Sequence, residues 1–183
     1  MHDRQPIPDF LDRSGLRDGT DSRGSGMRSH ALLSPCRRYR FALWRHWDIG
    51  PQVLFVMLNP STADESTDDP TVRRCIGFAR SWGFGSLAVG NLFAFRTSSP
   101  AELSACTDPV GPENDHWLSL LHEESSLTIA AWGNHGRLLG QSTNVRRMLR
   151  GLHILGLTEL GEPRHPLYIR SGVMPRPWPA PIA

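Results

Sequence analysis

The chain has 183 residues, of which 39% are hydrophobic and 21% are charged, and its formal net charge at pH 7 is +2. These values lie close to globular averages, so they exclude a wholly disordered, collagen-like or fibrous protein and indicate one domain of ordinary size. No apolar run approaches the roughly 18 to 20 residues of a membrane-spanning helix, so we expect no membrane partner. All 20 basic residues are arginine. That bias is explained more readily by a GC-rich coding sequence than by a selected binding surface.

The two ends of the chain differ in composition from its middle. Residues 1–34 hold glycines and prolines among alternating Asp and Arg, which predicts a disordered or extended N-terminal tail. Alternate prolines near the other end predict a Pro-rich C-terminal tail over residues 171–183. A single α/β domain is therefore expected over residues 35–170. The first 12 residues lack the apolar stretch of a secretory signal, which predicts a cytoplasmic protein.

Short apolar runs alternate with longer amphipathic stretches in the middle of the chain. Aromatic and β-branched residues predict strands over residues 39–47 and 53–58, and Asp69 followed by Pro70 begins a predicted helix over residues 69–82. The pattern continues in chain order with a strand (87–89), a helix (112–122), a strand (127–132), a helix (135–149) and a strand (153–155). This alternation predicts a three-layer α/β/α fold with a short central, mainly parallel sheet.

Polar and glycine-rich loops follow the predicted strands. They cover residues 59–64, 91–96, 133–137 and 163–166. Ligands bind beyond the carboxyl ends of the strands in sheets of this class. We therefore expect the four loops to share one rim and to form the binding site.

The first loop offers an amide and several carboxylates. Pro60 restricts Asn59 to extended backbone, and the Asn59 amide either holds a water or a ligand edge or only caps its own turn. Asp68 and Asp69 are explained as helix caps, which leaves Asp64 as the acid with the least structural explanation.

The later loops offer an amide beside aromatic rings, a glycine-rich turn and a histidine. Asn91 near Phe93 has the composition of a nucleobase pocket, although such rings are more often part of a core. Gly133–Gly136 would let the backbone approach a ligand. His165 lies among prolines and is a candidate general acid or hydrogen-bond donor. The three widely spaced cysteines fit no disulfide framework or Cys-x-x-Cys metal site, and we expect neither a metal nor a cofactor.

Six sequence blocks resemble the signature blocks of a bacterial and phage family of domains of unknown function. They read VMLNPSTAD (56–64), DPTVRRC (69–75), NLFA (91–94), DPVGPEND (108–115), AWGNHG (131–136) and PRHPLY (163–168). The blocks span about residues 38–170, but the family implies no reaction.

The order of these motifs is also similar, at a greater distance, to the uracil-DNA glycosylase superfamily. The shared features are an Asn-Pro after the first strand, a later strand ending in Asn, a glycine at a strand exit and a final His-Pro loop. This resemblance implies that Asn59 positions a hydrolytic water, Asn91 reads a flipped base and His165 stabilises negative charge on the departing base. The final loop reads His-Pro-Leu-Tyr where that superfamily has His-Pro-Ser.

The leading hypothesis is therefore a glycosylase-like hydrolase that acts on a nucleobase in DNA or in a nucleotide by metal-free N-glycosidic hydrolysis. One alternative is a non-catalytic nucleic-acid or nucleotide-binding module of the same fold. The other is a different hydrolase that uses Asp64, His135 and His165. The candidate catalytic residues are Asn59 and His165, and the candidate substrate-binding residues are Pro60, Ser61, Asp64, Asn91, Phe93, Arg96, Gly133, His135 and Arg164.

Overall fold

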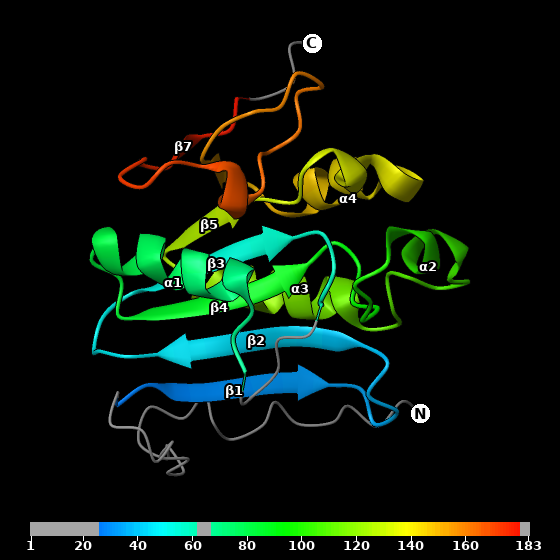
Figure 1. Ribbon diagram of the computed structural model, residues 1–183, viewed down its shortest axis with the longest axis horizontal. Coiled ribbons are helices and arrows are strands. Elements are labelled where there is room, and N and C mark those ends of the chain that lie inside the picture. Colours follow the sequence, from blue (N-terminus) through cyan, green and yellow to red (C-terminus); the bar gives the residue numbers. More distant parts are fainter. Residues whose placement is uncertain (1–25, 62–66, 180–183) are drawn as a thin grey trace.

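The computed structural model describes residues 26–61 and 67–179 (Figure 1). Seven strands in these residues form one sheet in the order β1-β2-β4-β3-β5-β6-β7. Their bounds are β1 Arg28–Leu33, β2 Arg40–His46, β3 Gln52–Met57, β4 Ser86–Asn91, β5 Leu127–Ala130, β6 His153–Ile154 and β7 Arg176–Pro177. The four inner strands β4, β3, β5 and β6 are parallel. The outer strands β1, β2 and β7 pair antiparallel with their neighbours.

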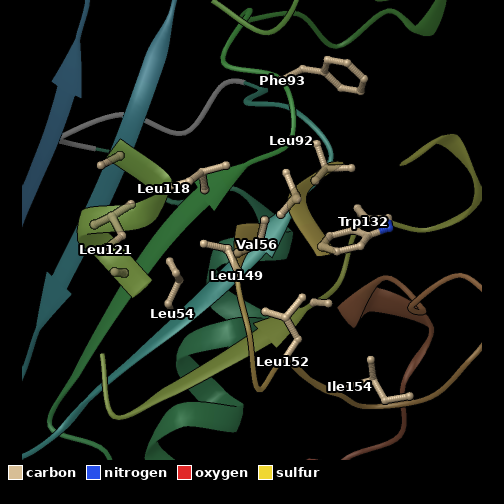
Figure 2. Packing of buried hydrophobic residues seen from close by; sticks show 14 of the residues in the cluster. Leu54, Val56, Leu92, Phe93, Leu118, Leu121, Trp132, Leu149, Leu152 and Ile154 are labelled. Atoms are coloured by element: carbon tan, nitrogen blue, oxygen red, sulfur yellow. The ribbon is translucent and has the colours of Figure 1, made fainter. Parts of the chain in front are cut away.

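Helices pack against both faces of this sheet. Their bounds are α1 Pro70–Ser81, α2 Pro100–Ala105, α3 Asn114–Glu124 and α4 Gln141–Met148, with 3-10 helices η2 Asn134–Gly140 and η3 Pro166–Tyr168. The apolar side of α1 packs with Val53 and Phe55 of β3 on one face. Leu118 and Leu121 of α3 pack with Leu54 and Val56 on the other, together with residues from α4 (Figure 2). Successive β3 residues are thus buried on opposite faces, as is typical of inner parallel strands.

The order of the parallel strands creates a crevice at one end of the sheet. From β3 the chain runs through α1 to β4 on one side, and from β4 it returns through α3 to β5 on the other side of β3. The connections leave β3 and β5 in opposite directions, so their loops separate at the carboxyl ends of these strands. Such a switch point is the usual ligand position in open α/β sheets.

The α/β prediction is confirmed at the level of a mixed sheet with helices. The sheet is less parallel than predicted, because β2 enters it antiparallel to β4 and carries β1 on its outer side. Local composition predicts that β2 is a strand but not its direction. The helix predicted over residues 135–149 is interrupted at Leu138 and Leu139, whose backbone angles are not helical. None of the helices in the described residues has the length and apolar character that crossing a bilayer demands.

Folded structure extends into both segments that the sequence assigns to tails. Residues 28–33 form β1, which pairs with β2 along its whole length. At the other end, β7 pairs with β6, and Trp178 packs against the core. The short strand at β7 tolerates Pro177 because it lies at an edge of the sheet. Residues 1–25 and 180–183 lie outside the described residues.

Candidate functional site

A cavity of about 850 Å³ opens at the carboxyl ends of β3 and β5. Its volume falls in the range of about 300–1,000 Å³ that is usual for small-molecule sites. The predicted site residues that line it are Asn59, Ser61, Gly133, His135, Arg164 and His165. They come from the loops after β3, β5 and β6, so three of the four predicted rim loops meet at this cavity.

The amide of Asn59 is held in one orientation. Its Nδ2 donates to the backbone carbonyl oxygens of Thr97 at 2.7 Å and Pro60 at 3.2 Å. Both partners are acceptors, so the nitrogen must face them. Within the described residues no group donates a hydrogen bond to Oδ1 of Asn59. Asn59 therefore presents a fixed hydrogen-bond acceptor to a water or a ligand.

His165 occupies the N-cap position of η3. Its Nδ1 accepts a hydrogen bond from the backbone N–H of Leu167 at 3.4 Å. Burial lowers the pKa of His165 below its ordinary value, and the nearby carboxylate of Asp69 opposes this shift only in part. The imidazole is therefore neutral at pH 7. Because Nδ1 is the acceptor, the ring proton is on Nε2, which makes Nε2 a hydrogen-bond donor.

Asp69 joins the start of α1 to the cavity wall. One carboxylate oxygen accepts from the backbone N–H of Val72 at 2.8 Å and caps the helix, as the sequence predicts. The other accepts from the Ser61 hydroxyl at 2.6 Å. This second contact, and the position of Asp69 in the cavity lining, have no local sequence signal.

The loop that carries His165 is fixed by contacts with the exit of β5. The N–H of Gly133 donates to the carbonyl of Pro163 at 2.8 Å. The carboxylate of Glu162 accepts from Trp132 Nε1 at 2.9 Å and from Ser142 Oγ at 2.7 Å. These bonds hold the His165 loop beside the segment that follows β5.

Replacing Gly136 with alanine is expected to lower the free energy of unfolding by about 1–3 kcal/mol. A Cβ atom there would overlap the Trp132 ring, lying 2.6 Å from Nε1, so the indole would have to leave its contact with Glu162. Urea denaturation measures the change. The control is Gly77→Ala in α1, where a Cβ meets nothing within 4 Å and helix propensity predicts a gain of about 0.5–1 kcal/mol. Equal stability of the two variants would contradict the close packing of the Trp132 ring against Gly136.

The segment of the chain that carries the cavity matches one known protein family. A family model described as "Protein of unknown function (DUF1643)" matches residues 40–167. The chain belongs to the DUF1643 family. No curated protein and no solved structure gives a significant match. The matched residues run from the start of β2 to η3, so nearly all of the cavity lining of this DUF1643 domain lies inside the family match.

Other predicted site residues do not line the DUF1643 cavity. Asn91 is 1% exposed. Its Oδ1 accepts from Arg40 Nη2 at 3.4 Å, whereas its Nδ2 has no hydrogen-bond partner in the described residues. Phe93 is fully buried in the core, Pro60 is buried, and Arg96 donates to the carbonyl of Arg37. Asp64 lies outside the described residues.

The structure also places residues in the cavity lining that the sequence did not indicate. Arg40, at the start of β2, is only 2% exposed and still lines the cavity. An arginine at the start of an apolar strand is the signal that could have drawn attention to it. Trp132 and Thr158 also belong to the lining. Over residues 26–61 and 67–179, no group of three or more His, Cys, Asp or Glu side chains is arranged to hold a metal ion.

Proposed function

We propose that the DUF1643 cavity binds a nucleobase-bearing ligand and hydrolyses its N-glycosidic bond. The observation that carries this proposal is the pairing of two fixed groups in one cavity. Asn59 offers an acceptor oxygen, and neutral His165 offers an Nε2–H donor. Hydrolysis of this bond requires a placed water on one side and a donor for the departing base on the other.

The two groups take complementary parts in the reaction. Asn59 Oδ1 accepts one hydrogen of a water whose oxygen attacks the anomeric carbon of the sugar. The bond from that carbon to the base nitrogen breaks, and its electron pair leaves with the base. The Nε2–H of His165 donates to the base as negative charge develops on it. The proton lost by the water neutralises the released base.

The motif order that resembles the uracil-DNA glycosylase superfamily supports this proposal, with two changes of role. Asn91 lies below the cavity surface, and Phe93 packs in the core, so neither contacts a ligand in this conformation. Trp132 and Tyr168 are the aromatic side chains that line the cavity. Trp132 is only 2% exposed and belongs to the same core cluster as Phe93, whereas Tyr168 is 78% exposed. We therefore assign base stacking to the Tyr168 ring and not to Phe93.

A base-release assay tests the proposed reaction. Oligonucleotides carrying uracil, hypoxanthine, alkylated bases or phage-type modified bases are incubated with the protein and with the His165→Ala variant. The expected result is release of at least one base by the wild type and its loss in the variant. Binding without release on any substrate would favour the non-catalytic binding module. Release that stops when a chelator is added would favour the hydrolase that uses Asp64, His135 and His165.

The rate of base release is expected to rise with pH below neutrality and to reach a plateau near pH 7. Burial holds the pKa of His165 below its ordinary value, so protonation occurs only in mild acid. The protonated ring would turn Nδ1 into a donor facing the Leu167 N–H, which disrupts the bond that orients the ring. A pH–rate profile checks this, with His135→Gln as the control for the other imidazole in the cavity. A rate that falls as pH rises to 7 would instead identify a protonated general acid.

A further inference from the structure

A second cavity, of about 870 Å³, lies against α4, and most of the charged residues that line it are arginines. Four arginines line it, Arg137, Arg146, Arg147 and Arg150. The only acidic residue in the lining is Glu162. Four positive charges against one negative charge make this a strongly positive concave surface.

Glu162 neutralises only part of this charge. Its side chain is 10% exposed, and its carboxylate oxygen Oε1 lies 3.4 Å from Nε of Arg137. The same carboxylate already accepts hydrogen bonds from Trp132 and Ser142. The carboxylate is therefore fully occupied within the fold. The positive charge of the other three arginines is not offset by any acid in the lining.

The helix dipole accounts for two of the arginines but not for all four. Arg146 and Arg147 lie in the last turn of α4, where a positive charge stabilises a helix. Arg137 precedes the helix and Arg150 follows it. Arg146 also packs over the Trp178 ring at 4.0 Å. Arg147 and Arg150 are exposed, and neither side chain forms an ion pair or hydrogen bond with another described residue.

The two cavities flank the same short segment. Within η2, Asn134 and His135 line the first cavity and Arg137 lines the second. Trp132 in the wall of the first packs edge-on against Trp178 in the wall of the second, with 5.5 Å between ring centroids. A ligand with several linked phosphate groups can therefore contact the arginines while one of its bases enters the first cavity.

We propose that the arginine-lined cavity binds the phosphodiester backbone of a nucleic-acid strand. Guanidinium groups bind phosphate through two parallel hydrogen bonds, and several of them along one surface match a chain of phosphates. The placement of a base in the first cavity rests on the proposed function, but the backbone contact does not. The substrate of the first cavity is then a base carried by a polymer and not a free nucleoside.

Fluorescence anisotropy with a labelled single-stranded oligonucleotide tests the backbone contact. The double variant Arg147→Gln/Arg150→Gln is expected to raise Kd about 10-fold and to reduce the slope of log K against log salt by about 1.4, since each phosphate contact on a single strand contributes about 0.7. The control, Arg28→Gln/Arg80→Gln, removes the same charge from exposed positions that line neither cavity. Its Kd is expected to stay within about 2-fold of wild type, because its distant charges contribute little at moderate salt.

Equal weakening in the two double variants, or an unchanged salt slope in the first, would overturn the proposal. Binding to anionic phospholipid vesicles but not to the oligonucleotide would overturn it in favour of a membrane headgroup. Base release separates this result from the proposed function. If the wild type releases no base but the arginine variant still loses binding, only the proposed function fails. If the wild type and the arginine variant release base equally from an oligonucleotide and bind it equally, only the backbone proposal fails.

Discussion

Replacing Asn59 with alanine is expected to lower kcat for base release by about 100-fold or more, while KM changes little. The amide of Asn59 is fixed by two backbone carbonyls, so its Oδ1 is an acceptor that does not have to reorganise during the reaction. Loss of this oxygen removes the group that orients the water but leaves the cavity that binds the base. Steady-state kinetics on the best substrate of the base-release panel separate kcat from KM.

The matched control for this variant is Asn134→Ala. Asn134 lines the same cavity, is exposed, and forms no hydrogen bond with another described side chain. Its turnover is expected to remain within about 3-fold of wild type, since it places no group required by the reaction. Melting temperatures of both variants show whether the Thr97 contact of Asn59 also supports the fold. If both variants lose turnover equally, Asn59 has no special part in the chemistry.

Glu162→Ala is expected to lower the free energy of unfolding by about 2–4 kcal/mol. Glu162 is 8% exposed, and its carboxylate accepts from Trp132 Nε1 and Ser142 Oγ. Alanine would leave both donors buried without an acceptor, and an unsatisfied buried donor costs more than the bond itself contributes. The same change would loosen the loop that holds His165. Chemical denaturation measures the stability, and hydrogen exchange at the Gly133 amide follows the loop.

Two further variants define the origin of this effect. Glu162→Gln keeps one acceptor oxygen without the charge and is expected to lose less stability than alanine. Glu159→Ala removes an exposed acid three residues earlier and is expected to change stability by less than about 0.5 kcal/mol. Equal stability of the Glu162 and Glu159 alanine variants would show that the buried bonds contribute nothing.

Local pattern predicts most elements near the centre of the sheet. The Asp69-Pro70 start signal and the helical spacing of Val72, Ile76 and Ala79 give α1, and Asp69 is its N-cap. Strands β3 and β4 are predicted from apolar runs that are too short for a helix and typical of a buried strand. The six residues of strand β1, RSHALL, fall in the predicted N-terminal tail, because residues 1–34 show almost no apolar periodicity. It is stabilised by pairing with β2, which is a contact between segments that local pattern does not report.

The position of the cavity also follows largely from the sequence, because polar loops that follow parallel strands meet at one end of the sheet. The direction of individual side chains was not. Asn91 and Phe93 follow β4 as expected, but Asn91 is buried beside Arg40, and Phe93 packs in the core. Arg40 lines the cavity from β2. The local pattern predicts this strand but gives no indication that one of its residues belongs to the site.

Local sequence features fix the alternation of strands and helices, the start of α1 and the loops that carry Asn59 and His165, because residue spacing, helix capping and proline act over a few residues. Only the assembled sheet sets the direction of β2 and the orientation of the Asn59 amide. It also decided which arginines share a surface, as Arg137 and Arg150 do. These features depend on contacts between residues far apart in the chain, such as Asn59 with Thr97 and Glu162 with Trp132, whose geometry exists only once the sheet has assembled.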